Sequence, residues 1–340
     1  MTDILILSLQ ELQDKIAAIG GEKFRAKQIF NWLHVKQVTE FSEMSNLSEQ
    51  FRVKLAEHFC INRLNIQKKL VSEHDYTVKY LYGLPDGQKI ETVLMRYKHA
   101  NSLCISTQAG CRMNCTFCAS GITGFVRNLT PSEMLLQLYE SERDSGLSVG
   151  SVVLMGIGEP LDNFDNVVKF LRLLSDKDGR NMSLRHVSLS TCGLADKIDE
   201  LAELRSGLTL SVSLHAADDE TRSTIMPVNK KFNIERIMAS CKNYFEKTGR
   251  RVSFEYALIK DINDSLETAE KLSRLIKPIG AHLNLIPINH VHSKKHEKSA
   301  NVKAFHERLT SLGVNATVRR TLGADINAAC GQLRAQQLIN

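Results

Sequence analysis

The spacing of hydrophobic and polar positions changes near residue 100 and divides the chain into two patterns. Before that point, apolar residues recur at helical spacing in three stretches, and polar residues stand at their starts. Ser8 followed by Glu11 has the sequence of a capping box. The pattern predicts helices from Leu9 to near Gly20, from Phe24 to Leu33 and from Ser48 to Phe59.

A β-hairpin is predicted after these helices. Apolar and polar residues alternate from Tyr76 to Leu84 and again from Lys89 to Tyr97, and Pro85-Asp86-Gly87 between them is typical of a turn. We therefore expect a helical module at residues 1–75 and a hairpin extension at residues 76–100.

From Ser102 onward, short β-rich apolar runs alternate with stretches of helical spacing. The first helix opens at Thr130-Pro131-Ser132-Glu133, a capping box with proline at the first helical position. Six such units predict an α/β fold, and they favour a partial (β/α)6 TIM-like barrel over a closed eightfold one. The predicted strands are Leu103–Thr107, Ser151–Met155, His186–Ser190, Leu208–Leu214, Val252–Leu258 and His282–Ile286.

Composition is that of an ordinary soluble protein with one large domain and a smaller appendage, since 43% of residues are hydrophobic and 24% charged. No apolar run approaches the length of a membrane span, so no membrane partner is expected. The formal net charge is +6, and residues 286–340 hold eight Lys and Arg against three Asp and Glu. This basic region either faces nucleic-acid phosphates or is a solvated surface. Its side chains include Lys294, Lys295, Lys298, Arg319, Arg320, Arg334, His290, His292, His296 and His306.

Cys111, Cys115 and Cys118 follow the first predicted strand with the spacing C-x3-C-x2-C. Three thiolates crowded into one loop can bind three irons of a four-iron cluster and leave the fourth iron open. Because an open iron is reactive, the spacing favours an enzyme over an electron carrier. The loop also lies where a barrel places its active groups, at the carboxyl end of a strand.

Cys104, seven residues upstream, leaves other interpretations open. It could complete a four-cysteine zinc site or a closed ferredoxin-like cluster, although zinc sites usually have two separated C-x2-C pairs. A disulfide framework is disfavoured because the chain has eight cysteines in 340 residues and its first residues lack a signal-peptide pattern. A reducing, cytoplasmic compartment is expected.

The end of the second predicted strand carries another chemical signal, Gly156-Ile157-Gly158-Glu159-Pro160. Glycines let the backbone approach a ligand closely, and a glutamate can accept hydrogen bonds from an ammonium group. Together with the three-cysteine loop, this sequence resembles the radical S-adenosylmethionine superfamily. The resemblance implies one [4Fe-4S] cluster whose open iron binds S-adenosylmethionine and cleaves it to a 5'-deoxyadenosyl radical.

From about Phe24 to Leu333 the chain also resembles the RlmN family, which methylates adenine carbon 2 in 23S ribosomal RNA and transfer RNA. The resemblance implies that residues 101–320 form a radical SAM partial barrel and residues 321–340 a catalytic cysteine loop and tail. RNA binding is one candidate role for the N-terminal module. The motifs are Phe24–Ile29, Glu91–Val93, Ser106–Cys111, Gly124–Leu129, Ser213–Ala216, Met226–Lys231 and Asp325–Leu333.

Carbon 2 of adenine is electron-poor and cannot attack a methyl sulfonium, whereas a cysteine thiolate can. The resemblance implies that Cys330 is this nucleophile and becomes S-methylcysteine with a first S-adenosylmethionine. A second molecule then yields the radical that removes hydrogen from the S-methyl group, and the carbon radical adds to adenine. By the same resemblance, Glu91 accepts a proton and Cys104 resolves the adduct through a transient disulfide with Cys330.

The family's contacts to S-adenosylmethionine carry over to residues at predicted strand ends. Without the resemblance, the two serines among them would be polar residues that close a strand. Expected partners are 23S ribosomal RNA, transfer RNA and an electron donor such as flavodoxin with its reductase, and the protein is expected to be a monomer. The contact residues are Gly158, Glu159, Ser190, Ser213, Leu214, His215 and Asn289.

The Cfr-like carbon-8 methyltransferases are the alternative among enzymes, because they share the cluster, both catalytic cysteines and the barrel. Pro160 after Glu159 favours the carbon-2 group. The alternative of another class is a zinc-stabilised RNA-binding protein without catalysis.

Overall fold

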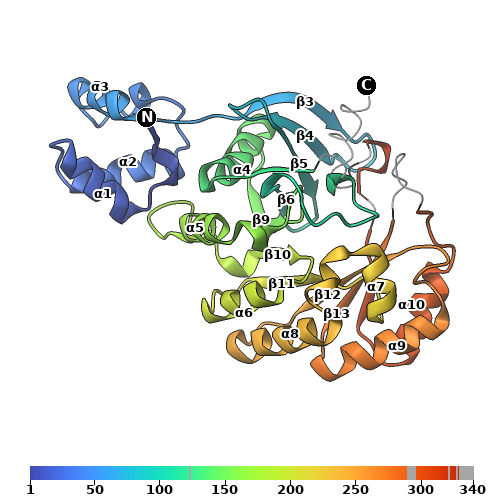
Figure 1. Cartoon of the computed structure of the whole chain (residues 1–340). Helices are drawn as coiled ribbons and strands as arrows, with labels where there is room; N and C mark the ends of the chain where they lie inside the picture. Colours follow the sequence, from blue (N-terminus) through green and yellow to red (C-terminus); the bar gives the residue numbers. More distant parts are fainter. Residues whose placement is uncertain (122–123, 289–295, 321, 327, 329–340) are drawn as a thin grey trace.

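The computed structural model describes residues 1–340 apart from 122–123, 289–295, 321, 327 and 329–340. The three predicted N-terminal helices are confirmed and lie together beside the rest of the molecule (Figure 1). The capping box is present, since the Ser8 hydroxyl oxygen accepts from the Glu11 N–H at 3.3 Å and Glu11 accepts from the Ser8 N–H at 2.7 Å. The module comprises β1 (Thr2–Asp3), η1 (Ile4–Ile6), α1 (Leu9–Ala18), α2 (Phe24–His34), η2 (Phe41–Glu43), α3 (Glu49–His58) and β2 (Phe59–Cys60).

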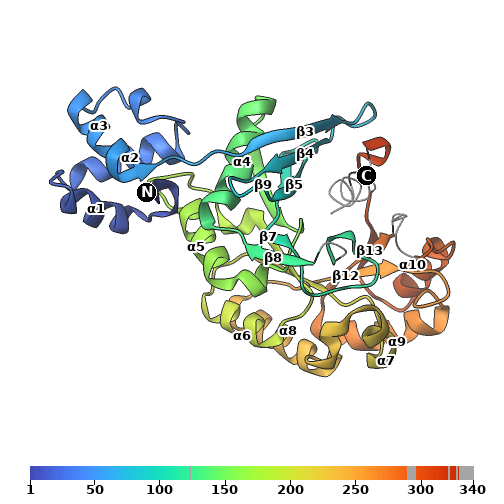
Figure 2. The same ribbon diagram turned by 45° about the horizontal axis from the view of Figure 1, so that its top comes forward.

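Ten strands form one sheet in the order β14-β13-β12-β11-β10-β9-β6-β5-β4-β3. The strands from β6 to β14 in this order are parallel, and helices α5, α6, α8, α9 and α10 form an arc around the sheet (Figure 2). The predicted α/β partial barrel is therefore confirmed. The parallel strands are β6 (Asn101–Cys104), β9 (Val149–Leu154), β10 (Val187–Thr191), β11 (Thr209–Ser213), β12 (Ser253–Leu258), β13 (His282–Pro287) and β14 (Ala316–Val318).

The helices of the barrel follow these strands along the chain. None of those described has both the length and the apolar character that a membrane span requires. They are α4 (Pro131–Ser145), α5 (Phe164–Ser175), α6 (Ala195–Glu203), α7 (Asp219–Ile225), α8 (Ile234–Thr248), α9 (Leu266–Ile276) and α10 (Val302–Ser311).

Two strands of the main sheet are absent from the sequence prediction. β14 adds a seventh parallel strand but has only three residues, too few for a periodic signal. β3 (Asn65–Val71) lies within the module expected to be helical and pairs antiparallel with β4. Its residues are almost all exposed, so the alternation typical of a half-buried strand is missing. The predicted hairpin is confirmed as β4 (Val78–Gly83) and β5 (Lys89–Arg96), and through β5 and β6 it continues the main sheet.

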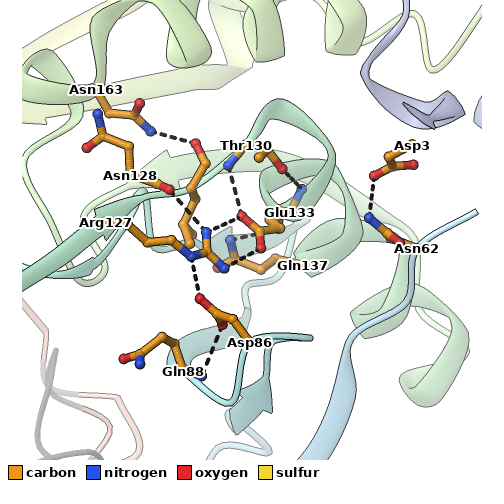
Figure 3. Close-up of polar contacts among 11 residues, drawn as sticks. Asp3, Asn62, Asp86, Gln88, Arg127, Asn128, Thr130, Glu133, Gln137 and Asn163 are labelled. Carbon is orange, nitrogen blue, oxygen red and sulfur yellow. Dashed lines mark hydrogen bonds and ion pairs between the residues drawn. The ribbon is translucent and has the colours of Figure 1, made fainter. Parts of the chain in front are cut away.

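One arginine joins the hairpin turn to the first barrel helix. Arg127 on β8 (Phe125–Asn128) donates two hydrogen bonds of 2.8 Å to the Glu133 carboxylate and one of 2.6 Å to Asp86 (Figure 3). Glu133 also completes the predicted capping box of α4, because it accepts from the Thr130 N–H at 2.9 Å. The short strand β7 (Gln108–Gly110) pairs with β8. The contacts of Arg127 therefore also fix β7 relative to the start of α4.

Replacing Arg127 should destabilise the fold measurably. Arg127→Ala removes a two-pronged pair and leaves the nearly buried Glu133 without its cation. We expect the free energy of unfolding to fall by about 2 kcal/mol, measured by denaturant titration. Arg127→Lys keeps the charge but loses the planar fork, so it should recover only part of the loss. An Ala variant as stable as the parent protein would contradict this assignment.

Candidate active site

The three cysteines lie in the loop between β7 and β8. Gly110 has a φ of +77°, and a Cβ atom there would lie 1.8 Å from the Gly124 carbonyl oxygen, so only glycine permits this loop closure. The Cys111 N–H donates to the same oxygen at 3.1 Å, and the Thr116 N–H donates to the Ile225 carbonyl at 2.9 Å. Backbone contacts therefore hold the loop at its start and in its middle.

All three cysteines line one cavity of about 340 Å³. Burial raises the pKa of Cys111 to about 12 and also raises that of Cys115, so a metal must displace their protons on binding. Among the described residues, no three His, Cys, Asp or Glu side chains converge on a single metal ion. A four-iron cluster binds each of three thiolates at a separate iron, and the three cysteines that line this cavity supply such a donor set.

The strand end at residues 156–159 packs its backbone against residues 105–108, where the chain leaves β6. A Cβ atom on Gly156 would lie 2.6 Å from the Ile105 carbonyl oxygen, and one on Gly158 would lie 2.6 Å from the Gln108 Cβ. Gly158 also has a φ of +110°. Glycine at both positions is therefore required for this strand end to reach the segment that leads into the cysteine loop.

Glu159 is buried at the cavity and joins two strand ends. Its Oε2 accepts from the Cys192 N–H at 2.7 Å, and its Oε1 accepts from the Leu161 N–H at 3.0 Å. Burial raises the pKa of this carboxyl. Each carboxylate oxygen can accept more than one hydrogen bond, so capacity remains for the ammonium group that the sequence predicts as a ligand.

The structure brings together five of the seven predicted S-adenosylmethionine contacts. Leu214 is not among the residues that line the cavity, and its side chain lies in the main hydrophobic core. Its backbone N–H donates to the Glu255 carbonyl, and its carbonyl accepts from Arg222. Asn289 lies outside the described residues. The contacts that line the cavity are Gly158, Glu159, Ser190, Ser213 and His215.

His215 is a neutral hydrogen-bond acceptor in this structure. Its Nδ1 accepts from the Ala257 N–H at 2.9 Å, and burial lowers its pKa to about 3. Its ring forms a T-shaped contact with Phe117 of the cysteine loop, with ring centroids 4.8 Å apart. The imidazole therefore joins β12 to the cysteine loop and carries no charge into the cavity.

Arg222 on α7 is a site residue that the sequence patterns did not indicate. It is fully buried and donates to the carbonyl oxygens of Cys192 at 2.7 Å, Ser213 at 3.0 Å and Leu214 at 3.0 Å. These carbonyls lie at the ends of β10 and β11, so the guanidinium fixes two edges of the cavity. Its position in a short helix directly after the fourth predicted strand was the only available signal.

Glu91 and Cys104 lie on the face of the sheet that forms part of the cavity wall. Cys104 on β6 is the register partner of Val93 on β5, and Glu91 precedes Val93 by two residues, so all three side chains share one face. Val93 and Met95 line the cavity, whereas Glu91 and Cys104 lie beside it. Cys104 packs in an apolar cluster with Val93 and Met95.

The C-terminal segment reaches this wall through the turn between β3 and β4. Asp75 accepts a hydrogen bond from the Gly323 N–H at 2.8 Å, and Asp325 accepts one from the Glu73 N–H at 2.9 Å. Ala328 packs in the same apolar cluster as Cys104. Cys330 itself lies outside the described residues, and the two contacts with the turn direct the chain before it toward Cys104.

Only part of the predicted basic region is described. Arg319 and Arg320 line the cavity, whereas His306 contacts the Ala316 carbonyl at 3.1 Å within the barrel. His296 contacts the Thr116 hydroxyl of the cysteine loop at 2.8 Å, and Lys298 is exposed. The positions outside the described residues are Lys294, Lys295, His290, His292 and Arg334.

Fold and cavity together define a radical SAM enzyme. Residues 105–272 match the model of the Radical SAM superfamily, and residues 2–61 match that of the ribosomal RNA large subunit methyltransferase N-terminal domain. A crystal structure of a radical SAM methyltransferase from Sphaerobacter thermophilus is 38% identical, covers 98% of this chain and 100% of that chain, and superposes with a TM-score of 0.94. The second match ends before β3, in agreement with the place of β3 in the main sheet.

Two curated relatives specify the family. The probable dual-specificity RNA methyltransferase RlmN of Clostridium novyi (strain NT) is 47% identical over 342 residues, with 100% of each chain covered. Its counterpart from Lachnoclostridium phytofermentans is 48% identical over 334 residues, covering 98% of this chain and 94% of the relative. The chain belongs to the RlmN family, which confirms the resemblance seen in the sequence. Membership implies a [4Fe-4S] cluster and S-adenosylmethionine, and the donor set of the cavity fits both.

A methyl group at Gly158 should block cofactor binding. In Gly158→Ala the new Cβ collides with Gln108 and moves the strand end that carries Glu159, so we expect at least about tenfold weaker binding of S-adenosylmethionine. Anaerobic titration of the reconstituted protein measures this. Gly146→Ala is the matched control, because Gly146 also has a positive φ but has open space around it. Equal binding by the two variants would argue against the close-approach role of Gly158.

Proposed function

We propose that this protein methylates carbon 2 of a specific adenosine in 23S ribosomal RNA and in transfer RNA, and consumes two S-adenosylmethionine molecules per turnover. One observation carries the proposal: Cys104 and Glu91 share the sheet face that walls the cavity containing the three-cysteine loop and Glu159. The relatives' description as dual-specificity RNA methyltransferases supports the substrate class.

Cys330 acts first, as the acceptor of a methyl group. Its thiolate attacks the sulfonium methyl of one S-adenosylmethionine, forming S-methylcysteine and releasing S-adenosylhomocysteine. When bound, the iron-sulfur cluster with a second S-adenosylmethionine supplies the radical that removes one hydrogen atom from this methyl group. The remaining sulfur-bound carbon then bonds to carbon 2 of adenine, so that the RNA is joined covalently to Cys330.

Release uses the two side chains beside the cavity. Glu91 accepts the carbon-2 proton of the adduct. The Cys104 thiol then loses its proton and forms a sulfur–sulfur bond with Cys330, the carbon–sulfur bond to Cys330 breaks, and the freed carbon takes up a proton. The one electron that the adduct must lose would be accepted by the cluster when it is bound. A reductant outside the chain must afterwards restore the two thiols. Cys104 packs against the apolar side chains of Val93 and Met95, in the cluster that Ala328 of the C-terminal segment also contacts.

Arg319 and Arg320 provide positive charge at the cavity for the phosphates of the RNA. We further propose that the protein works as a cytoplasmic monomer and that a flavodoxin-type donor with its reductase supplies electrons.

Product analysis tests the proposed function. The reconstituted protein is incubated with methyl-deuterated S-adenosylmethionine and either a 23S ribosomal RNA fragment or transfer RNA, and nucleosides are identified by mass spectrometry. We expect labelled 2-methyladenosine from both RNA types. Labelled 8-methyladenosine as the sole product would replace the proposal by the Cfr-like alternative, and methylation of one RNA type alone would remove the dual specificity.

Loss of Cys104 should trap the covalent intermediate. In Cys104→Ala the acceptor Cys330 can still be methylated and can still add to adenine, but no thiol is left to resolve the adduct. We expect an RNA–protein adduct visible in a denaturing gel, with freely released product reduced at least about 100-fold. Cys330→Ala should give neither adduct nor methylation.

The matched control is Cys60→Ala, which removes a half-buried thiol of β2 in the N-terminal module. It should release methylated RNA at the parent rate. Release at the parent rate by Cys104→Ala would eliminate Cys104 from the reaction.

A further inference from the structure

Lys79 is a buried lysine at the edge of the cavity wall that no sequence motif singles out. It lies on β4, next to β5, and its Nζ is 3.6 Å from Glu91 Oε2. The side chain of Lys79 is 1% exposed and that of Glu91 is 3% exposed. Burying an ammonium group is costly, and pairing it with a carboxylate often only offsets that cost. Stability alone therefore does not explain why this ion pair is buried here.

The register places the pair on the catalytic face. Lys79 is the partner of Val93, and Val93 is in turn the partner of Cys104, so Lys79, Val93 and Cys104 form a row across β4, β5 and β6. Glu91 lies on the same face, one step along β5. Lys79 and Cys104 therefore lie on opposite sides of the strand that carries Glu91. All three side chains belong to the layer that forms the wall of the cavity.

We propose that Lys79 is a positioning residue for Glu91: its ammonium group keeps the buried carboxylate ionised and aimed at the adduct, ready to accept the carbon-2 proton. This inference rests on the proposed function. A buried carboxylate without a nearby cation takes up a proton at a higher pH, because burial disfavours its charged form. A protonated Glu91 cannot serve as the proton acceptor, so Lys79 determines the pH range over which release proceeds.

Other titratable groups face the pair or lie near it. On the same face of the sheet these are Lys68 on β3, Lys89 on β5 and the Cys104 thiol. Asp75 and Asp325 lie at the β3–β4 turn and the C-terminal segment packed on it, and Arg319 and Arg320 line the cavity. Lys68 is exposed to solvent, whereas Lys79 is buried against the carboxylate. Solvent screens the charge of Lys68, whereas the buried ammonium group of Lys79 lies 3.6 Å from the Glu91 carboxylate.

The test compares pH profiles of product release for the parent protein, Lys79→Met and Lys79→Arg, with RNA carrying hydrogen or deuterium at carbon 2. For Lys79→Met we expect normal S-methylation of Cys330, release slowed at least about tenfold at pH 7, and an acid limb moved upward by about one to three pH units. The deuterium isotope effect should rise, because proton removal becomes rate-limiting. Lys79→Arg keeps the charge, so its acid limb should stay close to that of the parent protein.

S-methylation of Cys330 reports that the fold, the cluster and the first S-adenosylmethionine site are intact, so each variant is scored only on later steps. An acid limb and isotope effect in Lys79→Met identical to those of the parent would overturn the inference. If the neutral variant does not fold, Lys79→Arg decides, because an acid limb displaced by a full unit despite normal S-methylation would also overturn it. Lys68→Met is the matched control and should leave the profile unchanged.

Glu91→Gln separates this inference from the function on which it rests. Parent-like release by Glu91→Gln would refute the proton-acceptor role itself, whatever Lys79→Met does. Blocked release in Glu91→Gln together with a parent-like pH profile in Lys79→Met would refute only the role of Lys79.

Discussion

The site depends on the close packing of two strand ends, residues 105–108 after β6 and residues 156–159 after β9. Their backbones come within hydrogen-bonding distance, with the Gly156 N–H donating to the Ile105 carbonyl at 3.0 Å. Ser106 secures the contact, since its hydroxyl donates to the Glu91 carbonyl at 2.6 Å and accepts from the Ile157 N–H at 3.0 Å. One buried hydroxyl thus links the strand of Glu91, the entry to the cysteine loop and the strand end that carries Glu159. Removing it would break hydrogen bonds to two buried backbone groups.

Several buried charged side chains lie at the strand ends and the wall of the cavity. Arg222 donates to three backbone carbonyls at strand ends, Glu159 accepts from two backbone N–H groups, and Lys79 faces Glu91. Each of these groups would be costly in an apolar core without such partners. Because the partners are largely backbone atoms, the charges also fix the strand ends against which a cofactor must fit.

The chemistry proposed for this family member requires two thiols that are 226 positions apart in the sequence to meet. The antiparallel extension of the sheet is the element that makes such a meeting feasible. β5 places Val93 and Met95 around Cys104, and the β3–β4 turn holds the C-terminal segment through Asp75 and Asp325.

The sequence by itself determined the class of protein. Its evidence consists of local patterns, namely the cysteine spacing, the paired glycines before Glu159 and the alternation of strand and helix. Each pattern spans neighbouring residues, so it can be recognised without knowledge of the fold. Tertiary structure decided the rest. β3 is polar and exposed and therefore has no strand signal of its own, and Leu214 turns its side chain into the core beside two cavity-lining neighbours. Lys79 and Arg222 look like surface residues in the sequence, and only the pairing of β4 with β5 and the packing of α7 on two strand ends reveal the partners that make their burial possible.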